Sequence, residues 1–194
     1  RIARSIKNAR FHSKASIEEI IYDQSRNIDK TKLMRLAQCE FISKKENVLI
    51  TGSTGVGKSY IATALGYQAC IHGYRVMYFN TTKLFSKLKM AKADGSYLKE
   101  LAKIERQNLI ILDDFGLQPL DGQNRIALLE IIEDRTGKGS VIVTSQVPVQ
   151  AWYKTIGEKT IADAILDRLI HGSHRIELEG ESMRRKRIIQ NKKK

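Results

Sequence analysis

Residues 48–59 read VLITGSTGVGKS, an apolar run followed by a glycine-rich loop. Gly52, Gly55 and Gly57 let backbone amides approach a bound group closely, because glycine has no side chain to obstruct them. The run VLIT has strand length, and the segment 59–73 has apolar residues near one helical stripe and ends at a glycine. The stretch therefore predicts strand, loop and helix, the context in which GxxxxGKS forms the phosphate-binding Walker A loop.

This loop predicts a site for a nucleoside triphosphate. Backbone amides and the helix N-terminus favour phosphate oxygens, and the ammonium of Lys58 can reach the β and γ phosphates. The hydroxyl of Ser59 can ligate Mg²⁺. The residues expected to contact the nucleotide are Gly52, Ser53, Thr54, Gly55, Val56, Gly57, Lys58, Ser59 and Tyr60.

A second motif, LIILDDFG at 109–116, admits two interpretations. Asp-Phe-Gly holds magnesium in protein kinases, but the chain lacks the GxGxxG loop and His-Arg-Asp loop that a kinase needs. In a Walker A enzyme, a buried apolar strand delivers acids beside the phosphates. Asp113 is then the predicted magnesium-side carboxylate, and Asp114 the predicted base that orients or deprotonates the attacking water.

The order of apolar segments predicts an α/β fold with a mainly parallel sheet flanked by helices, because strand-length runs alternate with helix-period segments. The predicted strands are 48–51, 75–80, 109–114, 140–146 and 174–178. Helices are expected over 59–73, from an Asp121 cap to the glycines near 137, and over 158–170. A packing helix is expected over 31–42, before the first strand.

Composition favours a polyanionic partner, since 34 Lys and Arg against 21 Asp and Glu give a formal charge of +13. Arg4 and Lys7 belong to a basic amphipathic helix at the start of the chain. Two cysteines without metal-ligand spacing favour a reduced, cytoplasmic setting. No apolar run approaches the roughly 20 residues that span a bilayer, so we expect no membrane insertion. The alternative to a polyanionic partner is a basic surface that serves only solubility.

These motifs, together with VTSQVP (143–148), ADAILDRLIHGSHRIEL (162–178) and GESMR (180–184), resemble the IstB helper ATPases of bacterial insertion sequences. Those proteins are AAA+ P-loop NTPases close to the DnaC helicase loaders and the DnaA initiators. The resemblance implies a five-stranded AAA+ sheet in an ATPase domain over 45–187, preceded by an N-terminal helical extension (1–44) and followed by a basic tail (188–194). Residues before Arg1 could form part of a further N-terminal domain.

The resemblance also implies roles for single residues. Ser145 and Gln146, with Thr144 behind them, match the sensor I segment that monitors the γ phosphate. Arg168 matches an arginine finger, which completes the site of a neighbouring subunit and implies head-to-tail assembly. Arg184 matches the sensor II arginine. A surface role is the alternative for either arginine.

Similarity to the initiator proteins further implies an extra helical element after the second strand, for which 81–107 is long enough. Its lysines are candidates for contacts with DNA phosphates, which would not read sequence. The residues predicted to bind DNA are Lys83, Lys87, Lys89 and Lys92, with Arg4 and Lys7 at the N-terminus. For roughly half of the lysines, a solvated helix face is the alternative.

The lead hypothesis is an Mg²⁺-dependent ATPase that oligomerises on duplex DNA and assists a transposase. A helicase loader that binds single-stranded DNA and a replicative helicase is the main alternative. A P-loop kinase that acts on a small molecule is disfavoured, because the sequence shows neither an arginine-rich lid nor an acceptor-site signature. Adenine is favoured over guanine because no NKxD-type motif follows the Walker residues.

Overall fold

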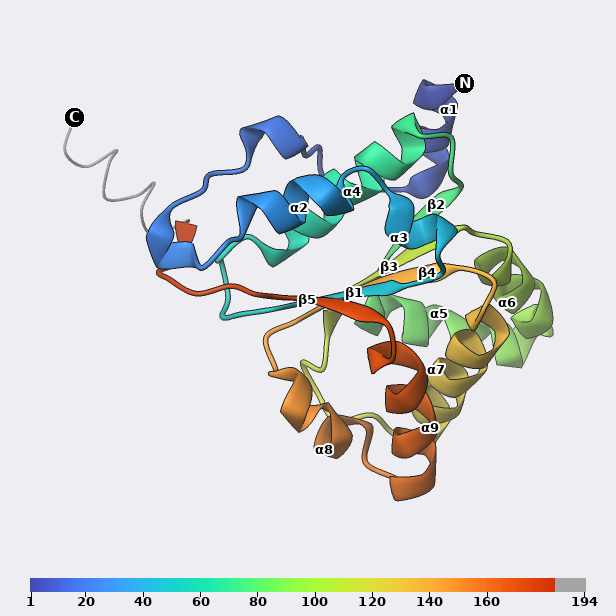
Figure 1. Cartoon of the computed structure of the whole chain (residues 1–194). Coiled ribbons are helices and arrows are strands. Elements are labelled where there is room, and N and C mark those ends of the chain that lie inside the picture. The colour runs from blue at the N-terminus through green and yellow to red at the C-terminus, as the bar shows by residue number, and fades with distance from the viewer. Residues whose placement is uncertain (184–194) are drawn as a thin grey trace, which may run out of the picture.

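The computed structural model describes residues 1–183, which contain one parallel five-stranded sheet in the order β2-β3-β4-β1-β5 (Figure 1). The strands are β1 (Asn47–Thr51), β2 (Val76–Asn80), β3 (Leu109–Phe115), β4 (Ser140–Ser145) and β5 (Ser173–Glu177). Every predicted strand is present, with small shifts at the ends, and the predicted five-stranded parallel sheet is confirmed. The predicted C-terminal tail and Arg184 lie outside the described residues.

Helices cover both faces of the sheet, because side chains of one strand alternate between the two faces. Val48 and Ile50 of β1 face one apolar cluster, and Leu49 between them faces the other. The first cluster is covered by α1 (Ile2–Ala9), α2 (Lys30–Leu36), α3 (Glu40–Ser43) and α4 (Lys58–Ile71). The second is covered by α5 (Thr81–Asp94), α6 (Tyr97–Glu105), α7 (Gly122–Arg135), α8 (Trp152–Ile156) and α9 (Lys159–Ile170).

The single packing helix expected over 31–42 is wrong, because the chain breaks there into α2 and α3. Cys39, the residue before α3, has a left-handed backbone with φ 62°, which an α-helix cannot contain. The break turns Phe41 and Ile42 into the core, where they are 3% and 0% exposed. Apolar spacing alone did not reveal this break.

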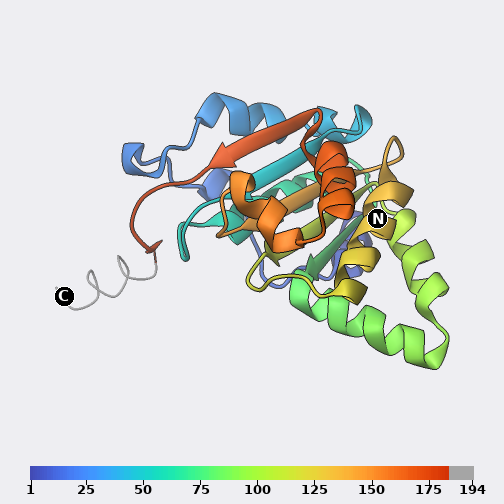
Figure 2. The ribbon, with the colours of Figure 1, turned by 90° about the horizontal axis from the view of Figure 1, so that it is seen from below.

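The segment 81–107 forms a pair of helices. Asn80 caps α5 by accepting a hydrogen bond from the Lys83 amide. Gly95 then ends α5 in the left-handed conformation at φ 81°, and α6 turns back toward the sheet. Figure 2 shows the two helices as an arm at the border of the molecule beside β2. Within residues 1–183, no helix is both long and apolar enough to cross a membrane.

Candidate functional site

The loop 52–57 connects β1 to α4 and borders a cleft of about 1040 Å³ at the carboxyl ends of the strands. Its three glycines, Gly52, Gly55 and Gly57, have no room for a side chain. A Cβ on Gly52 would lie 2.7 Å from the Leu178 carbonyl oxygen, and one on Gly57 would lie 2.6 Å from the Arg26 guanidinium. Gly57 also has φ 99°, which L side chains rarely adopt. The glycines thus serve packing as well as access to phosphate.

Lys58 opens α4 and is buried at 5% exposure. Its ammonium donates a hydrogen bond to the Ser53 carbonyl at 2.9 Å, which bends the side chain over the loop. Burial lowers the pKa of Lys58, while Asp114 and Asp113 oppose that shift. The Lys58 ammonium therefore lies between the loop and two acids. The phosphates of a nucleotide bound there could replace its contact with the Ser53 carbonyl.

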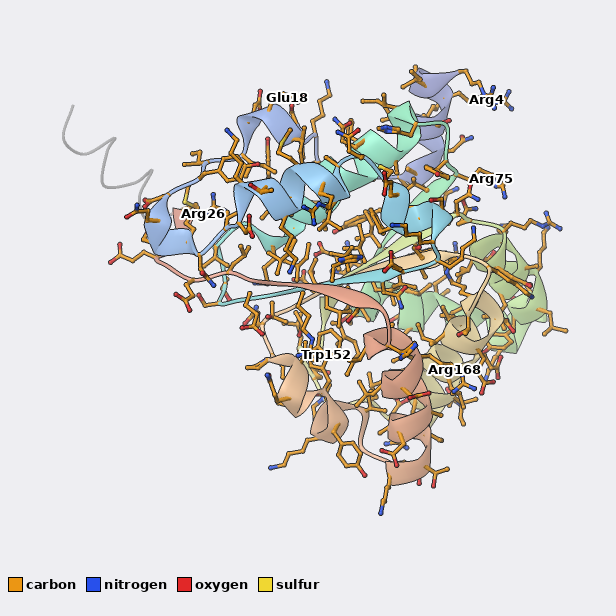
Figure 3. The ribbon with its side chains drawn as sticks, in the orientation of Figure 1. Arg4, Glu18, Arg26, Arg75, Trp152 and Arg168 are labelled. Atoms are coloured by element: carbon orange, nitrogen blue, oxygen red, sulfur yellow. The ribbon has the colours of Figure 1, made fainter. Side chains whose placement is uncertain are left out.

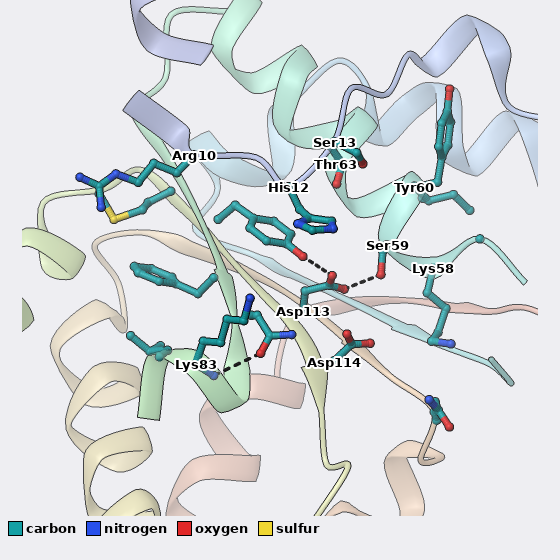
Figure 4. Close-up of a pocket in the computed structure, with 18 of the residues that line it drawn as sticks. Arg10, His12, Ser13, Lys58, Ser59, Tyr60, Thr63, Lys83, Asp113 and Asp114 are labelled. Atoms are coloured by element: carbon teal, nitrogen blue, oxygen red, sulfur yellow. Dashed lines mark hydrogen bonds between the residues drawn. The ribbon is translucent and has the colours of Figure 1, made fainter. Parts of the chain in front are cut away.

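Asp113 is a buried carboxylate, only 3% exposed, near the end of β3. Ser59 donates to its Oδ1 at 2.8 Å, as Figure 4 shows, and Thr144 donates to the same oxygen. Tyr78 donates to Oδ2. Each donor comes from a different element, so the carboxylate is fixed by the sheet and by α4 together.

Asp114 is part of a β-bulge in β3, and its side chain points away from that of Asp113. The pairing of β3 with β4 passes from Leu112–Val143 to Phe115–Ser145, so two residues oppose the single Thr144. Asp114 has φ 58°, and its amide donates to the Thr144 hydroxyl at 3.0 Å. Burial raises the pKa of Asp114, the neighbouring Asp113 raises it further, and Lys58 lowers it. The side chain lines the cleft (Figure 4).

Ser59 and Asp113 are the residues that fit a magnesium ion. A hydroxyl and a carboxylate 2.8 Å apart beside a phosphate loop are the hard oxygen donors that Mg²⁺ prefers. Within residues 1–183 no cluster of three His, Cys, Asp or Glu side chains could hold a metal by itself. An ion held by two protein oxygens, water and phosphates needs no such cluster.

The predicted sensor residues lie in different surroundings. Ser145 is fully buried, and its hydroxyl donates to the Phe115 carbonyl and accepts from the Val147 amide. Gln146 is exposed and lines the cleft. Of the two, only Gln146 is brought to the site. Arg184 cannot be placed, because it lies beyond the described residues.

Arg168 is not among the residues that line the cleft of its own chain. Figure 3 shows it on α9, on the other side of the sheet from Arg26. Its guanidinium donates to the Ala164 carbonyl at 2.8 Å and lies 3.6 Å from Glu133. The side chain is about one-third exposed. The guanidinium is therefore partly accessible to solvent.

The predicted DNA-binding side chains fall into two groups. Lys87 pairs with Glu100 at 3.2 Å, Lys89 pairs with Asp121 at 2.5 Å, and the Lys92 ammonium lies 4.7 Å from the Tyr97 ring centroid. Within residues 1–183, Arg4, Lys7 and Lys83 have no carboxylate within ion-pair distance. Lys83 lines the cleft, and the other two are exposed on α1.

Arg26 and Tyr78 line the cleft and were missed by the sequence analysis. Arg26, 6% exposed, donates to the Val56 carbonyl at 2.7 Å, and its own carbonyl accepts from the Glu179 amide at 3.0 Å. It thereby joins the N-terminal segment, the glycine loop and the chain after β5. Tyr78 was missed because an aromatic residue in a strand usually indicates core packing. Its contact with Asp113 depends on the pairing of β2 with β3.

Tyr60, predicted to contact nucleotide, lines the cleft and also holds the N-terminal segment. Its hydroxyl donates to Glu19 at 3.1 Å and accepts from the Ser16 amide at 3.2 Å. Thr54 lines the cleft as well, whereas Val56 is buried behind the loop at 1% exposure. The loop is therefore held by Arg26 through the Val56 carbonyl, while Thr54 borders the cleft.

The family profile described as IstB-like ATP binding protein matches residues 1–191. The chain belongs to this family. It is 44% identical to the insertion sequence ATP-binding protein y4pL of Sinorhizobium fredii over 95% of this chain and 76% of that protein. It is 46% identical to y4uH of the same organism, over 96% of this chain and 75% of that protein.

Solved structures share the fold at lower identity. DnaI has a TM-score of 0.73 at 23% identity and covers 85% of this chain and 91% of its own. AMPPCP-bound DnaA from Aquifex aeolicus has a TM-score of 0.73 at 19% identity and covers 94% of this chain and 55% of its own. These similarities confirm the AAA+ P-loop fold, and the family match confirms the resemblance to IstB proteins.

Proposed function

We propose that this IstB-family chain is an Mg²⁺-dependent ATPase that assembles on duplex DNA and assists a transposase. The observation that carries the proposal is the bond between Ser59 of the glycine loop and the buried carboxylate of Asp113. It joins a phosphate-binding loop to an acid at the distance that a shared metal ion requires. The relatives are named as ATP-binding proteins of insertion sequences, which supports ATP as the nucleotide and transposition as the process.

In this proposal, amides of residues 52–59 and the Lys58 ammonium bind the phosphates. Ser59 and Asp113 hold the magnesium ion, which supplies charge neutralisation on the phosphate oxygens when bound. Asp114 accepts a proton from the attacking water. The oxygen of that water bonds to the γ phosphorus, and the bond between the γ phosphorus and the β–γ bridging oxygen breaks. The raised pKa of Asp114 supports this role, because it makes the carboxylate a better base.

Arg168 acts on the site of a neighbouring subunit. Its exposure and its distance from the cleft of its own chain support action in trans. Gln146, at the rim of the cleft, is the better placed of the sensor I candidates, and Arg184 remains the sensor II candidate. Because one subunit supplies the cleft and the next supplies the arginine, the assembly is head-to-tail, either a closed ring or an open helix.

Contact with DNA is assigned to the basic side chains of α1 and of the α5 N-terminus. Arg4, Lys7 and Lys83 are the strongest candidates, because within residues 1–183 no carboxylate neutralises them. Lys87, Lys89 and Lys92 are weaker candidates since they already have partners. Such contacts neutralise phosphates without reading bases, so binding should be nonspecific and should weaken with salt.

Binding of a fluorescent ATP analogue tests the nucleotide assignment. Lys58→Ala should weaken binding by about tenfold or more, because it removes the buried cation that faces the phosphates. Lys44→Ala is the matched control, since Lys44 is an exposed lysine paired with Glu40 at 3.5 Å. Equal affinity of wild type and Lys58→Ala, or no binding by wild type, would contradict the assignment.

A further inference from the structure

The buried carboxylate of Asp113 has a third hydroxyl partner that the proposed ATPase chemistry does not use. Ser59 and Thr144 both donate to Oδ1, while the Tyr78 hydroxyl donates to Oδ2. Tyr78 lies on β2, two residues before Asn80, which pairs directly with Asp113. The side chain therefore reaches the carboxylate from the neighbouring strand, across from the glycine loop.

The two oxygens of a carboxylate can exchange places by rotation about the bond between Cβ and Cγ. A donor on Oδ2 opposes that rotation, since a hydrogen bond to a charged acceptor contributes more than one between neutral groups. The phenol is well fixed, because its ring packs against the apolar cluster beside α4. With Oδ2 held, Oδ1 stays directed at Ser59 and accepts the proton of its hydroxyl. The lone pairs of the Ser59 oxygen then remain available to a metal ion.

We propose that Tyr78 is a positioning residue of the magnesium site. Its hydroxyl holds the Asp113 carboxylate in the orientation that presents Oδ1 to Ser59 and the phosphate loop. Partners of metal ligands act in this way in other sites, where they orient the ligand and tune the affinity for the metal. The inference rests on the proposed function, because it concerns the same Ser59–Asp113 pair.

The test replaces one oxygen and leaves the ring in place. Tyr78→Phe should raise the Mg²⁺ concentration that half-saturates binding of fluorescent ADP by about tenfold, in line with losses at other outer-shell partners. ADP affinity in EDTA and the melting temperature without Mg²⁺ should stay close to wild type. Tyr97→Phe is the matched control, since the Tyr97 hydroxyl donates to a carboxylate, Glu130, but does not line the cleft.

A second variant separates positioning from general packing. In an Asp113→Asn background the carboxylate that Tyr78 orients is already gone. Adding Tyr78→Phe there should change the half-saturating Mg²⁺ concentration by less than about twofold. An unchanged magnesium requirement in Tyr78→Phe alone would overturn the inference. A loss of ADP affinity that is equally large in EDTA, or a full tenfold effect in the Asp113→Asn background, would also overturn it.

The inference and the proposed function fail in different ways. If wild-type protein binds ADP with no magnesium dependence, the proposed metal site itself is wrong. If wild type depends on magnesium and Tyr78→Phe matches it, only the role of Tyr78 is wrong.

Discussion

Asp113 and Asp114 are adjacent carboxylates in different surroundings. Both line the cleft, but Asp113 is 3% exposed and accepts from three hydroxyls, whereas Asp114 faces Lys58. The sequence LDD predicts two acids beside the phosphate loop, and the structure brings both there. The bulge that separates their directions depends on pairing with Thr144 of another strand, which no local pattern contains.

Removal of the proposed base should separate hydrolysis from binding. Asp114→Asn keeps the size of the side chain but accepts a proton poorly, so ATP turnover should fall by about 100-fold or more. Nucleotide affinity should stay within about threefold, because Lys58 and the loop amides still hold the phosphates. Phosphate release and fluorescent-nucleotide binding measure the two quantities.

Asp134→Asn is the control for this substitution. Asp134 lies on α7, its pKa is also raised by burial, and it does not line the cleft. Turnover of this control should match wild type. Wild-type turnover by Asp114→Asn would remove Asp114 from the role of base.

At the scale of elements, local signals predicted the ends of α4, α7 and α9 to within a few residues. Asp121 caps α7 by accepting from the Asn124 amide, as predicted. The break between α2 and α3 was missed because it depends on where Phe41 and Ile42 find space in the core. The return of α6 toward the sheet was likewise missed, since Arg135 holds its end and that bond joins residues far apart in sequence.

Arg135 should be a large contributor to stability. It is 2% exposed and donates to the carbonyls of Ile104, Gln107 and Ser140 at 2.7–2.9 Å. Arg135→Met removes these donors and leaves buried carbonyls without partners, so the free energy of unfolding should fall by about 3 kcal/mol. Urea denaturation followed by circular dichroism measures the change.

Arg168→Met is the matched control for Arg135→Met. Its side chain is one-third exposed and its ion pair with Glu133 is long, so its loss should cost at most about 1 kcal/mol. Equal destabilisation by the two substitutions would contradict the structural role of Arg135. The control also separates stability from the function proposed for Arg168.

At the scale of the molecule, the N-terminal segment and the chain after β5 meet at the glycine loop. Arg26 links them, and the Met183 amide donates to the Gly55 carbonyl at 2.9 Å. The net charge of +13 predicted a polyanionic partner, but it could not show which cations lack acidic neighbours. The arrangement of subunits also lies beyond one chain, and the resemblance alone supplied it.

Mixing two inactive variants tests whether Arg168 acts in trans. Arg168→Ala keeps an intact cleft, and Asp114→Asn keeps an intact arginine. In an equimolar mixture, about a quarter of head-to-tail interfaces combine the intact cleft with the intact arginine. Turnover should therefore return to about a quarter of the wild-type value. A mixture no more active than the separate variants would contradict action between subunits.

The central claim is that ATP drives assembly of this chain on duplex DNA. The most direct measurement is a gel shift with duplex and single-stranded DNA in ATP, in ADP and without nucleotide, with the complexes sized in parallel. The account predicts duplex binding that requires ATP, weakens with salt and gives a complex of many subunits. A preference for single strands would favour a helicase loader, and binding as a monomer regardless of nucleotide would contradict the account.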